Sequence, residues 1–461
     1  MRRLTLLLIV LVCLFLPAGT AIAEADRPNV VLILADDLGH GDLGVTGSDY
    51  HLTPRLDALA AESVRFTRAY TNAPNCAPTR AALMSGMYAP RTGIYTVGNS
   101  ARGKAANRKL VPTPNETDLR QDIVTLPEAL KSAGYRTGIF GKWHLGDDPT
   151  EQGFDTRFMS GKQGHPASYH GPFDAMADST KSDYLDDVLT DAAIEFLPKS
   201  GDNQPFFLYL PHYTVHTPIQ PEASRLAAAK AREKGKRHKR ADYAAMVESL
   251  DHNVGRVLDA LADRGLAENT VVIFLSDNGG HEGVTTMEPL RGAKGQLYEG
   301  GLRTPLFVRW GNRFQPADVA EPVLSFDLYP TLIELAAARL PEQPCDARSL
   351  VPLLYGKGEL AEQRDALFFH FPAYLQRSDP KNPWRTTPTG AMVAGDYKLI
   401  EFFEDGSLEL YDLEIDPGET RNLAAETPEL TRRLHEMLKA WRSELRAPVP
   451  TELNPAFVGR D

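Results

Sequence analysis

The sequence predicts an α/β fold: a large, mostly parallel sheet sandwiched by helices, followed by a smaller C-terminal antiparallel sheet with a helix. Three observations predict it. Four apolar runs lack the polar–apolar alternation of half-exposed strands, which is typical of strands covered on both faces. Amphipathic helical patterns lie between these runs, as in doubly wound sheets. After about residue 365 the pattern changes to short strands joined by a polar turn and ends in a helix.

The individual elements follow from these patterns. The four predicted parallel strands are residues 30–34, 135–140, 206–210 and 271–275, and residues 306–310 are a fifth candidate strand. The predicted helices are 54–62, 126–133 and 241–264, the last with its apolar residues at spacings of three and four. In the C-terminal part we expect strands at 390–403 and 408–413, joined by the turn 404–407, and a helix at 427–445.

Composition limits the classes of function. The chain has 461 residues, 42% of them hydrophobic and 24% charged, which is ordinary globular composition. The net charge of −11 argues against nucleic acid as a partner.

The N-terminus has the features of a secretory signal peptide. Arg2 and Arg3 precede a short apolar stretch at 4–16, and Ala21-Ile22-Ala23 is typical of a cleavage site. The apolar stretch is shorter than the roughly 20 residues that a spanning helix needs, so an uncleaved anchor is the less favoured alternative. We therefore expect a signal peptide at 1–23, a catalytic domain at 24–364 and a small subdomain at 365–461. The protein would be exported, periplasmic or secreted, without a stable membrane span.

Polar residues follow the ends of two predicted strands and offer a cation site. Asp36 and Asp37 follow the first strand, and Asp277 and Asn278 follow the fourth. Ligands bind beyond the carboxyl ends of strands in such sheets, so these side chains can converge. Their oxygen donors suit a hard cation such as Ca²⁺ or Mg²⁺ rather than zinc.

The most specific segment is residues 76–86, Cys-Ala-Pro-Thr-Arg-Ala-Ala-Leu-Met-Ser-Gly, which resembles the sulfatase signature. Other matching segments follow in order: Gly-Lys-Trp-His-Leu-Gly at 141–146, Val-His-Thr-Pro at 215–218, Ser-Asp-Asn-Gly-Gly at 276–280, and the segments 291–295, 299–305 and 410–423. On these residues the chain is identified as a member of the formylglycine-dependent, arylsulfatase-type sulfatases of the alkaline-phosphatase-like superfamily. The resemblance covers about residues 28–424.

The resemblance implies a mechanism and a set of site residues. A maturation enzyme oxidises Cys76 to formylglycine, and one hydroxyl of its hydrate attacks sulfur. The implied catalytic residues are Cys76, Arg80, Lys142, His144, His216 and Lys294, and the implied ligands of one Ca²⁺ (or Mg²⁺) are Asp36, Asp37, Cys76, Asp277 and Asn278. In this scheme His216 and Lys294 assist the leaving oxygen, and His144 takes a proton from the second hydroxyl. Thr79 stands where many members have serine, and the additional serine that often holds the sulfate has no assigned counterpart.

Two other functions remain open at this point. One is a two-metal phosphatase or phosphodiesterase of the same superfamily, which would need a second set of ligands. The other is a degenerate, non-catalytic sulfatase.

The favoured substrate is a sulfated small molecule or carbohydrate. Its contacts would come from loops at 96–120, 157–180, 282–290 and 370–388. The candidate substrate-binding residues there are His165, His170, Trp384 and Arg385, and the same loops contain Lys104, Arg108, His370 and Tyr374.

Overall fold

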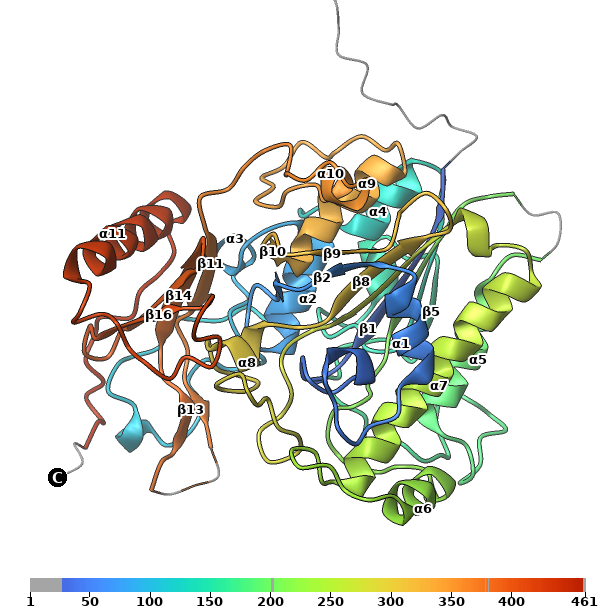
Figure 1. Ribbon diagram of the computed structural model, residues 1–461, viewed down its shortest axis with the longest axis horizontal. Helices are drawn as coiled ribbons and strands as arrows, with labels where there is room; N and C mark the ends of the chain where they lie inside the picture. Colours follow the sequence, from blue (N-terminus) through green and yellow to red (C-terminus); the bar gives the residue numbers. More distant parts are fainter. Residues whose placement is uncertain (1–26, 200–202, 378, 380, 459–461) are drawn as a thin grey trace, which may run out of the picture.

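A computed structural model describes residues 27–199, 203–377, 379 and 381–458; the predicted signal peptide lies outside them. An eight-stranded sheet forms its centre, in the order β5-β4-β6-β1-β7-β8-β2-β9 (Figure 1). Its strands are β1 (Asn29–Ala35), β2 (Val64–Phe66), β4 (Arg136–Phe140), β5 (Thr156–Phe158), β6 (Phe206–Pro211), β7 (Thr270–Ser276), β8 (Leu306–Trp310) and β9 (Ala317–Val319). The four predicted parallel strands are thus confirmed as β1, β4, β6 and β7, side by side and parallel. The fifth candidate is also a strand, β8, but it runs antiparallel to β7.

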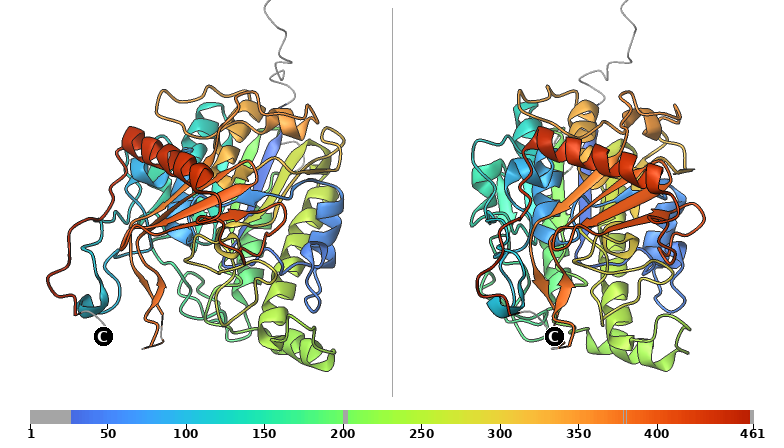
Figure 2. Two further views of the ribbon diagram at one scale, coloured as in Figure 1. Left: turned by 60° about the vertical axis from the view of Figure 1, so that its left-hand side comes forward. Right: turned by 90° about the vertical axis from the view of Figure 1, so that its left-hand side faces the viewer.

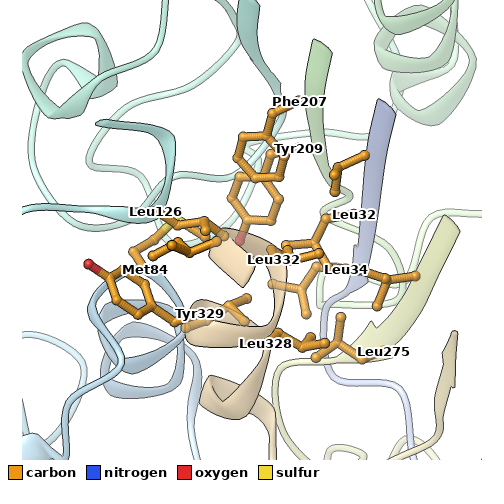
Figure 3. Close-up of a cluster of buried hydrophobic side chains, with 14 of the residues drawn as sticks. Leu32, Leu34, Met84, Leu126, Phe207, Tyr209, Leu275, Leu328, Tyr329 and Leu332 are labelled. Carbon is orange, nitrogen blue, oxygen red and sulfur yellow. The ribbon is translucent and has the colours of Figure 1, made fainter. Parts of the chain in front are cut away.

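Helices cover both faces of this sheet. On one face α1 (Pro54–Ala61), α5 (Leu185–Phe196) and α7 (Ala241–Asp263) pack on alternate residues of the central strands. On the other face α2 (Cys76–Ser85), α4 (Leu126–Ser132) and α9 (Leu328–Leu335) pack on the remaining residues. Figure 3 shows this second interface, where Leu32 and Leu34 of β1 point toward Leu328 and Leu332. Burial on both faces explains why these strands read as continuous apolar runs.

Several further helices and strands are short or peripheral. They are α3 (Ala89–Thr92), α6 (Ala223–Ala231), α8 (Glu299–Leu302), α10 (Val351–Leu354) and the short strands β3 (Ala69–Tyr70), β10 (Val323–Leu324), β12 (Leu375–Gln376) and β13 (Trp384–Thr386). Among the described residues, no helix has both the length and the hydropathy needed to cross a membrane.

The C-terminal part forms the predicted small antiparallel sheet. Its order is β11-β14-β15-β16, with β11 (Leu367–Phe371), β14 (Thr389–Ala394), β15 (Tyr397–Phe402) and β16 (Leu408–Asp412). Helix α11 (Pro428–Leu445) lies across one face of it (Figure 2).

The prediction of one strand over 390–403 was wrong, because this segment is a hairpin. Ala394 pairs with Tyr397, and only Gly395 and Asp396 lie between them. Gly395 has φ +57°, a left-handed conformation that two-residue hairpin turns require and that glycine adopts without strain. Gly395-Asp396 between two apolar runs is a turn signal that the prediction overlooked.

A buried ion-pair triad joins the small sheet to helix α8. Lys398 of β15 lies 3.1 Å from Glu299 of α8 and 3.0 Å from Glu419, and all three side chains are fully buried. Burial and the charge of Glu299 raise the pKa of Glu419 to about 7, although Lys398 lowers it. Lys398 is therefore the cation that allows two carboxylates to share this interface.

Replacing Lys398 by methionine should destabilise the protein strongly. The substitution leaves two buried carboxylates with only Arg303, 3.7 Å from Glu299, as a cation, which costs about 3–5 kcal/mol of unfolding free energy. Denaturant unfolding measures it, with Lys439→Met on the exposed face of α11 as the control. Equal stability of the two variants would contradict the role given to the triad.

Candidate active site

The carboxyl ends of β1 and β7 bring two pairs of polar residues together. Ala35 pairs with Ser276 at the strand ends, so Asp36 and Asp277 are neighbours by register. The Asp37 backbone N–H donates to Asp277 Oδ1 at 3.3 Å, and Asn278 Nδ2 donates to Asp37 Oδ1 at 2.8 Å. All four side chains are buried. The convergence expected from the sequence is confirmed.

Three oxygens in this group lack a hydrogen-bond donor. Asp36 Oδ1, Asp37 Oδ2 and Asn278 Oδ1 are buried and accept no hydrogen bond. Unsatisfied buried acceptors are costly, and several that converge are relieved by a cation. Ligand atoms of Asp36, Cys76 and Asp277 also lie within 4.8 Å of one another. The residues present therefore fit a hard divalent cation.

Each of the three carboxylates also has a basic partner. Lys142 Nζ lies 2.6 Å from Asp36 Oδ2, and Lys294 Nζ lies 2.6 Å from Asp37 Oδ1. These contacts place two lysines beside the candidate cation site, where they can face an anionic ligand.

The third pair joins a helix to the sheet. Arg80 of α2 donates through Nε and Nη2 to Asp277 Oδ2, at 3.0 and 2.8 Å, and through Nη1 to the Lys142 carbonyl at 2.6 Å. Arg80 and Lys142 are wholly buried, and Lys294 is 8% exposed. All three nitrogens of the guanidinium thus donate to the protein.

The pKa values of Asp36 and Asp37 are shifted in opposite directions. Burial, together with the charge of Asp277, raises the pKa of Asp36 to about 7 in spite of Lys142. Burial also acts to raise the pKa of Asp37, but the charges of Lys294 and His216 outweigh it and hold that pKa below its ordinary value. Repulsion within the carboxylate group is therefore only partly relieved by the protein's own cations.

Cys76 is the first residue of α2, at the centre of this group. It is 2% exposed. The Thr79 hydroxyl donates to the Ala73 carbonyl at 3.1 Å, and Asn75 Nδ2 donates to the Thr96 hydroxyl at 3.0 Å. These bonds fix the turn that leads into the helix, and threonine at position 79 supplies the hydroxyl that they need.

Two histidines face the same space. His144 has a left-handed φ of +66°, and burial together with the charges of Lys142 and Arg80 holds its pKa well below 6.5. His216 Nε2 lies 3.6 Å from Asp37 Oδ2, and burial together with the charge of Lys294 lowers its pKa to about 3. Both rings are therefore neutral at neutral pH and can accept a proton.

His212 is a structural residue of the segment that carries His216. It is buried and its Nδ1 lies 3.3 Å from Asp186 Oδ1, beneath the loop that carries His216.

The four candidate substrate residues lie around the site at different distances. The His165 ring stacks on His216, with centroids 6.0 Å apart. His165 and His170 line one cavity of about 480 Å³. Arg385 reaches the Lys294 carbonyl at 3.4 Å. Trp384 packs on Tyr374 and lines a separate cavity of about 500 Å³.

Three other loop residues support the fold. Tyr374 is buried and donates to Glu404 at 2.6 Å. His370 is 3% exposed, with Nε2 2.9 Å from the Pro448 carbonyl. Arg108 donates to backbone carbonyls of its own loop.

Sequence reasoning missed two residues that lie beside the site. His281 directly follows the segment 276–280, which is a signal that could have found it. Arg102 lies in the predicted substrate loop 96–120, where only Lys104 and Arg108 had been singled out. Both are within electrostatic range of site residues, His281 of Asp37 and Arg102 of Cys76.

A second His/Asp group lies apart from this site, made by Asp42, His51 and His238. Asp42 Oδ2 accepts from the Tyr243 hydroxyl at 2.7 Å, and His238 lies between Asp42 and Asp49 at 3.4 and 2.9 Å. Although burial opposes it, the carboxylates of Asp42 and Asp49 raise the pKa of His238.

Comparison with known proteins identifies the family. A model of the sulfatase family matches residues 28–338, and a model described as N-sulphoglucosamine sulphohydrolase, C-terminal, matches residues 293–444. A sulfatase of Formosa agariphila is 36% identical, over 92% of this chain and 90% of that protein. Human arylsulfatase A is 33% identical, over 97% of this chain and 93% of that protein.

Solved structures agree with this assignment. The crystal structure of Ps i-CgsB in complex with k-i-k-neocarrahexaose has a TM-score of 0.75 at 29% identity, covering 90% of this chain and 92% of that one. From the family match, these relatives and the shared fold, the chain belongs to the sulfatase family and is a sulfuric ester hydrolase.

Proposed function

We propose that this protein is an exported sulfatase that removes sulfate from a carbohydrate, with formylglycine at position 76 and one bound divalent cation. The observation that carries the proposal is the arrangement around Cys76: three donor-free oxygens on one side and the cations Arg80, Lys142 and Lys294 around them. A sulfate ester is anionic, and charge develops on its leaving oxygen in the transition state. Fixed cations in a buried site stabilise both.

Cys76 and the cation supply the chemistry that ordinary side chains lack. Hydrated formylglycine offers one hydroxyl as a nucleophile and a second whose deprotonation releases sulfate. Asp36, Asp37, Asp277 and Asn278 hold the cation, which supplies positive charge at the sulfate subsite when bound. Export rests on the sequence of residues 1–23.

The chain's own residues position charge and move protons. Arg80 is fixed by Asp277 and by the Lys142 carbonyl, so it stabilises charge without reorganising. Lys294 is charged, because Asp37 raises its pKa against the effect of burial, and it faces the leaving oxygen as a donor. His144 is a neutral imidazole that can take the proton of the second hydroxyl.

His216 has the tautomer that this role requires. Its Nδ1 lies 2.7 Å from the Thr217 carbonyl and donates there, so Nε2 faces the site. An anionic substrate beside Nε2 raises the pKa of this ring, which then donates to the leaving oxygen together with Lys294.

The proposed carbohydrate substrate rests on the surroundings of the site. His165 and His170 line an open cavity next to His216. The solved neighbour at 29% identity was crystallised with an oligosaccharide, as its description states.

Oxidation of Cys76 is tested by mass and by substitution. We expect the peptide that contains residue 76 to be about 18 Da lighter than the cysteine form. Cys76→Ser, made in a host that matures only cysteine, should lose at least ~10³-fold in turnover, because serine forms no geminal diol. Cys345→Ser, which alters the other described cysteine, is the control. Near-wild-type sulfate release by Cys76→Ser would falsify the formylglycine proposal.

One divalent cation per chain should be found by elemental analysis, Ca²⁺ or Mg²⁺. Asp277→Asn removes an anionic ligand and should lower both the bound metal and the activity. Asp318→Asn, at an exposed aspartate paired with Arg65, should keep both. Two equivalents of zinc per chain would contradict the single hard-cation site and favour a phosphatase.

Contacts with the leaving group should distinguish sugar from aryl substrates. His165→Ala and His170→Ala should lower kcat/KM about 10-fold more on a sulfated saccharide than on a small aryl sulfate, because the aryl ester does not fill that cavity. His252→Ala, on the exposed side of α7, is the matched control. If both variants keep wild-type activity on sulfated saccharides, this cavity is not the substrate subsite.

A further inference from the structure

Three basic side chains from distant parts of the sequence gather beside the sulfate subsite. They are Arg102, His281 and Arg385, named here the rim cluster. Arg385 lies on β13, His281 on the turn after β7, and Arg102 on the loop after α3. None of them belongs to the cation site or to the charge pairs around Cys76.

Arg385 is held in place by acceptors that carry no formal charge. Its Nη1 reaches the Lys294 carbonyl at 3.4 Å, and its Nη2 lies 3.3 Å from His281 Nε2. His281 Nδ1 lies 2.6 Å from the Glu282 carbonyl and donates there, so Nε2 is the acceptor that orients Arg385. Arg385 Nε is buried without a partner.

The nearest acidic side chain serves another arginine. Glu282 Oε1 lies 2.8 Å from Arg377 Nη2. Within the described residues, Arg385 forms no ion pair, and neither does Arg102. Burial lowers the pKa of both guanidinium groups. For Arg385 the charges of Glu282 and Asp37 oppose this effect, and the charge of Arg102 adds to it.

The loop that carries Arg102 is rigid. Arg108 Nη1 donates to the carbonyls of Ala101, Arg102 and Gly103, at 2.8, 3.2 and 2.7 Å. Residues 110–111 pair with the C-terminal segment at 452–453. Arg102 is therefore presented by a preorganised loop rather than by a mobile one.

Two partly dehydrated guanidinium groups that form no ion pair among the described residues are stabilised when an anion joins them. The sulfate ester under attack already has Arg80, Lys142 and Lys294. The charge of the rim cluster is therefore additional to what one sulfate needs. Arginine, with its planar fork, suits carboxylate and sulfate groups in a bidentate geometry.

We propose that the rim cluster is a second anion subsite, which binds a carboxylate or a second sulfate group of the substrate, on the sugar unit that carries the cleaved ester or on the adjoining one. This inference rests on the proposed carbohydrate function. It narrows the substrate class to saccharides with at least two negative groups. His281 acts as the positioning residue for Arg385.

The test compares three saccharides that carry the same cleavable sulfate. One has no other charged group, one also has a carboxylate, and one also has a second sulfate. Wild-type kcat/KM should be about 10- to 100-fold higher for one or both of the dianionic saccharides, mainly through KM. Their ranking distinguishes a carboxylate from a sulfate as the bound group.

Substitutions locate the preference. Arg385→Met and Arg102→Met should each reduce the ratio of dianionic to neutral kcat/KM toward one, and Arg385→Lys should restore part of it. The measured quantity is the ratio of kcat/KM for dianionic and neutral saccharides. A general loss of activity lowers both values and leaves this ratio unchanged. Arg65→Met, at an exposed ion pair, should leave the ratio unchanged.

The outcomes distinguish a failure of the second anion subsite from a failure of the proposed function. If all three saccharides are cleaved with equal kcat/KM, or if the arginine variants keep the wild-type ratio, the second subsite is wrong while the proposed function stands. If no saccharide is cleaved but an aryl sulfate is, the carbohydrate proposal and this inference both fail.

Discussion

The structure depends on charge balance at the carboxyl edge of a buried parallel sheet. Three carboxylates end up in the interior because β1 and β7 are adjacent and each ends in an acidic residue. An isolated buried carboxylate costs several kcal/mol. Here Asp36, Asp37 and Asp277 each have one basic side chain as an ion-pair partner, at 2.6–2.8 Å. The partners come from three other segments, so the charge balance also joins those segments.

The backbone around this edge is held in unfavourable conformations. Asp37 and His144 both have left-handed φ values, +62° and +66°, that non-glycine residues rarely adopt. Such strain persists only where the surrounding structure fixes it, and it concentrates at functional sites. The packed faces of the sheet supply that constraint, since α2 and α9 belong to one core with its strands.

The large domain and the C-terminal part contribute to different parts of the candidate site. The acidic residues after β1 and β7 and their basic partners Arg80, Lys142 and Lys294 belong to the large domain. The C-terminal part brings Arg385 of β13 to the Lys294 carbonyl, and it is anchored by the buried Lys398. Under the proposed function, substrate preference would vary in the C-terminal part and the loops, because loops tolerate change better than packed strands.

The sequence by itself determined the central strands, the helices at 54–62, 126–133, 241–264 and 427–445, and the acidic residues that follow β1 and β7. Local patterns suffice there, because burial on both faces yields apolar runs and because parallel strands place their ends together. The hairpin turn at Gly395-Asp396 was overlooked, although this pair is a turn signal, because only two residues interrupt a long apolar segment. Only the tertiary structure decided that Arg108 and Tyr374 support the fold while Arg102 and His281 border the site. Periodicity reports which face of an element is buried. The contact of Arg385 with His281, and the approach of Arg102 to Arg385, depend instead on how three distant segments pack, which their local sequence does not record.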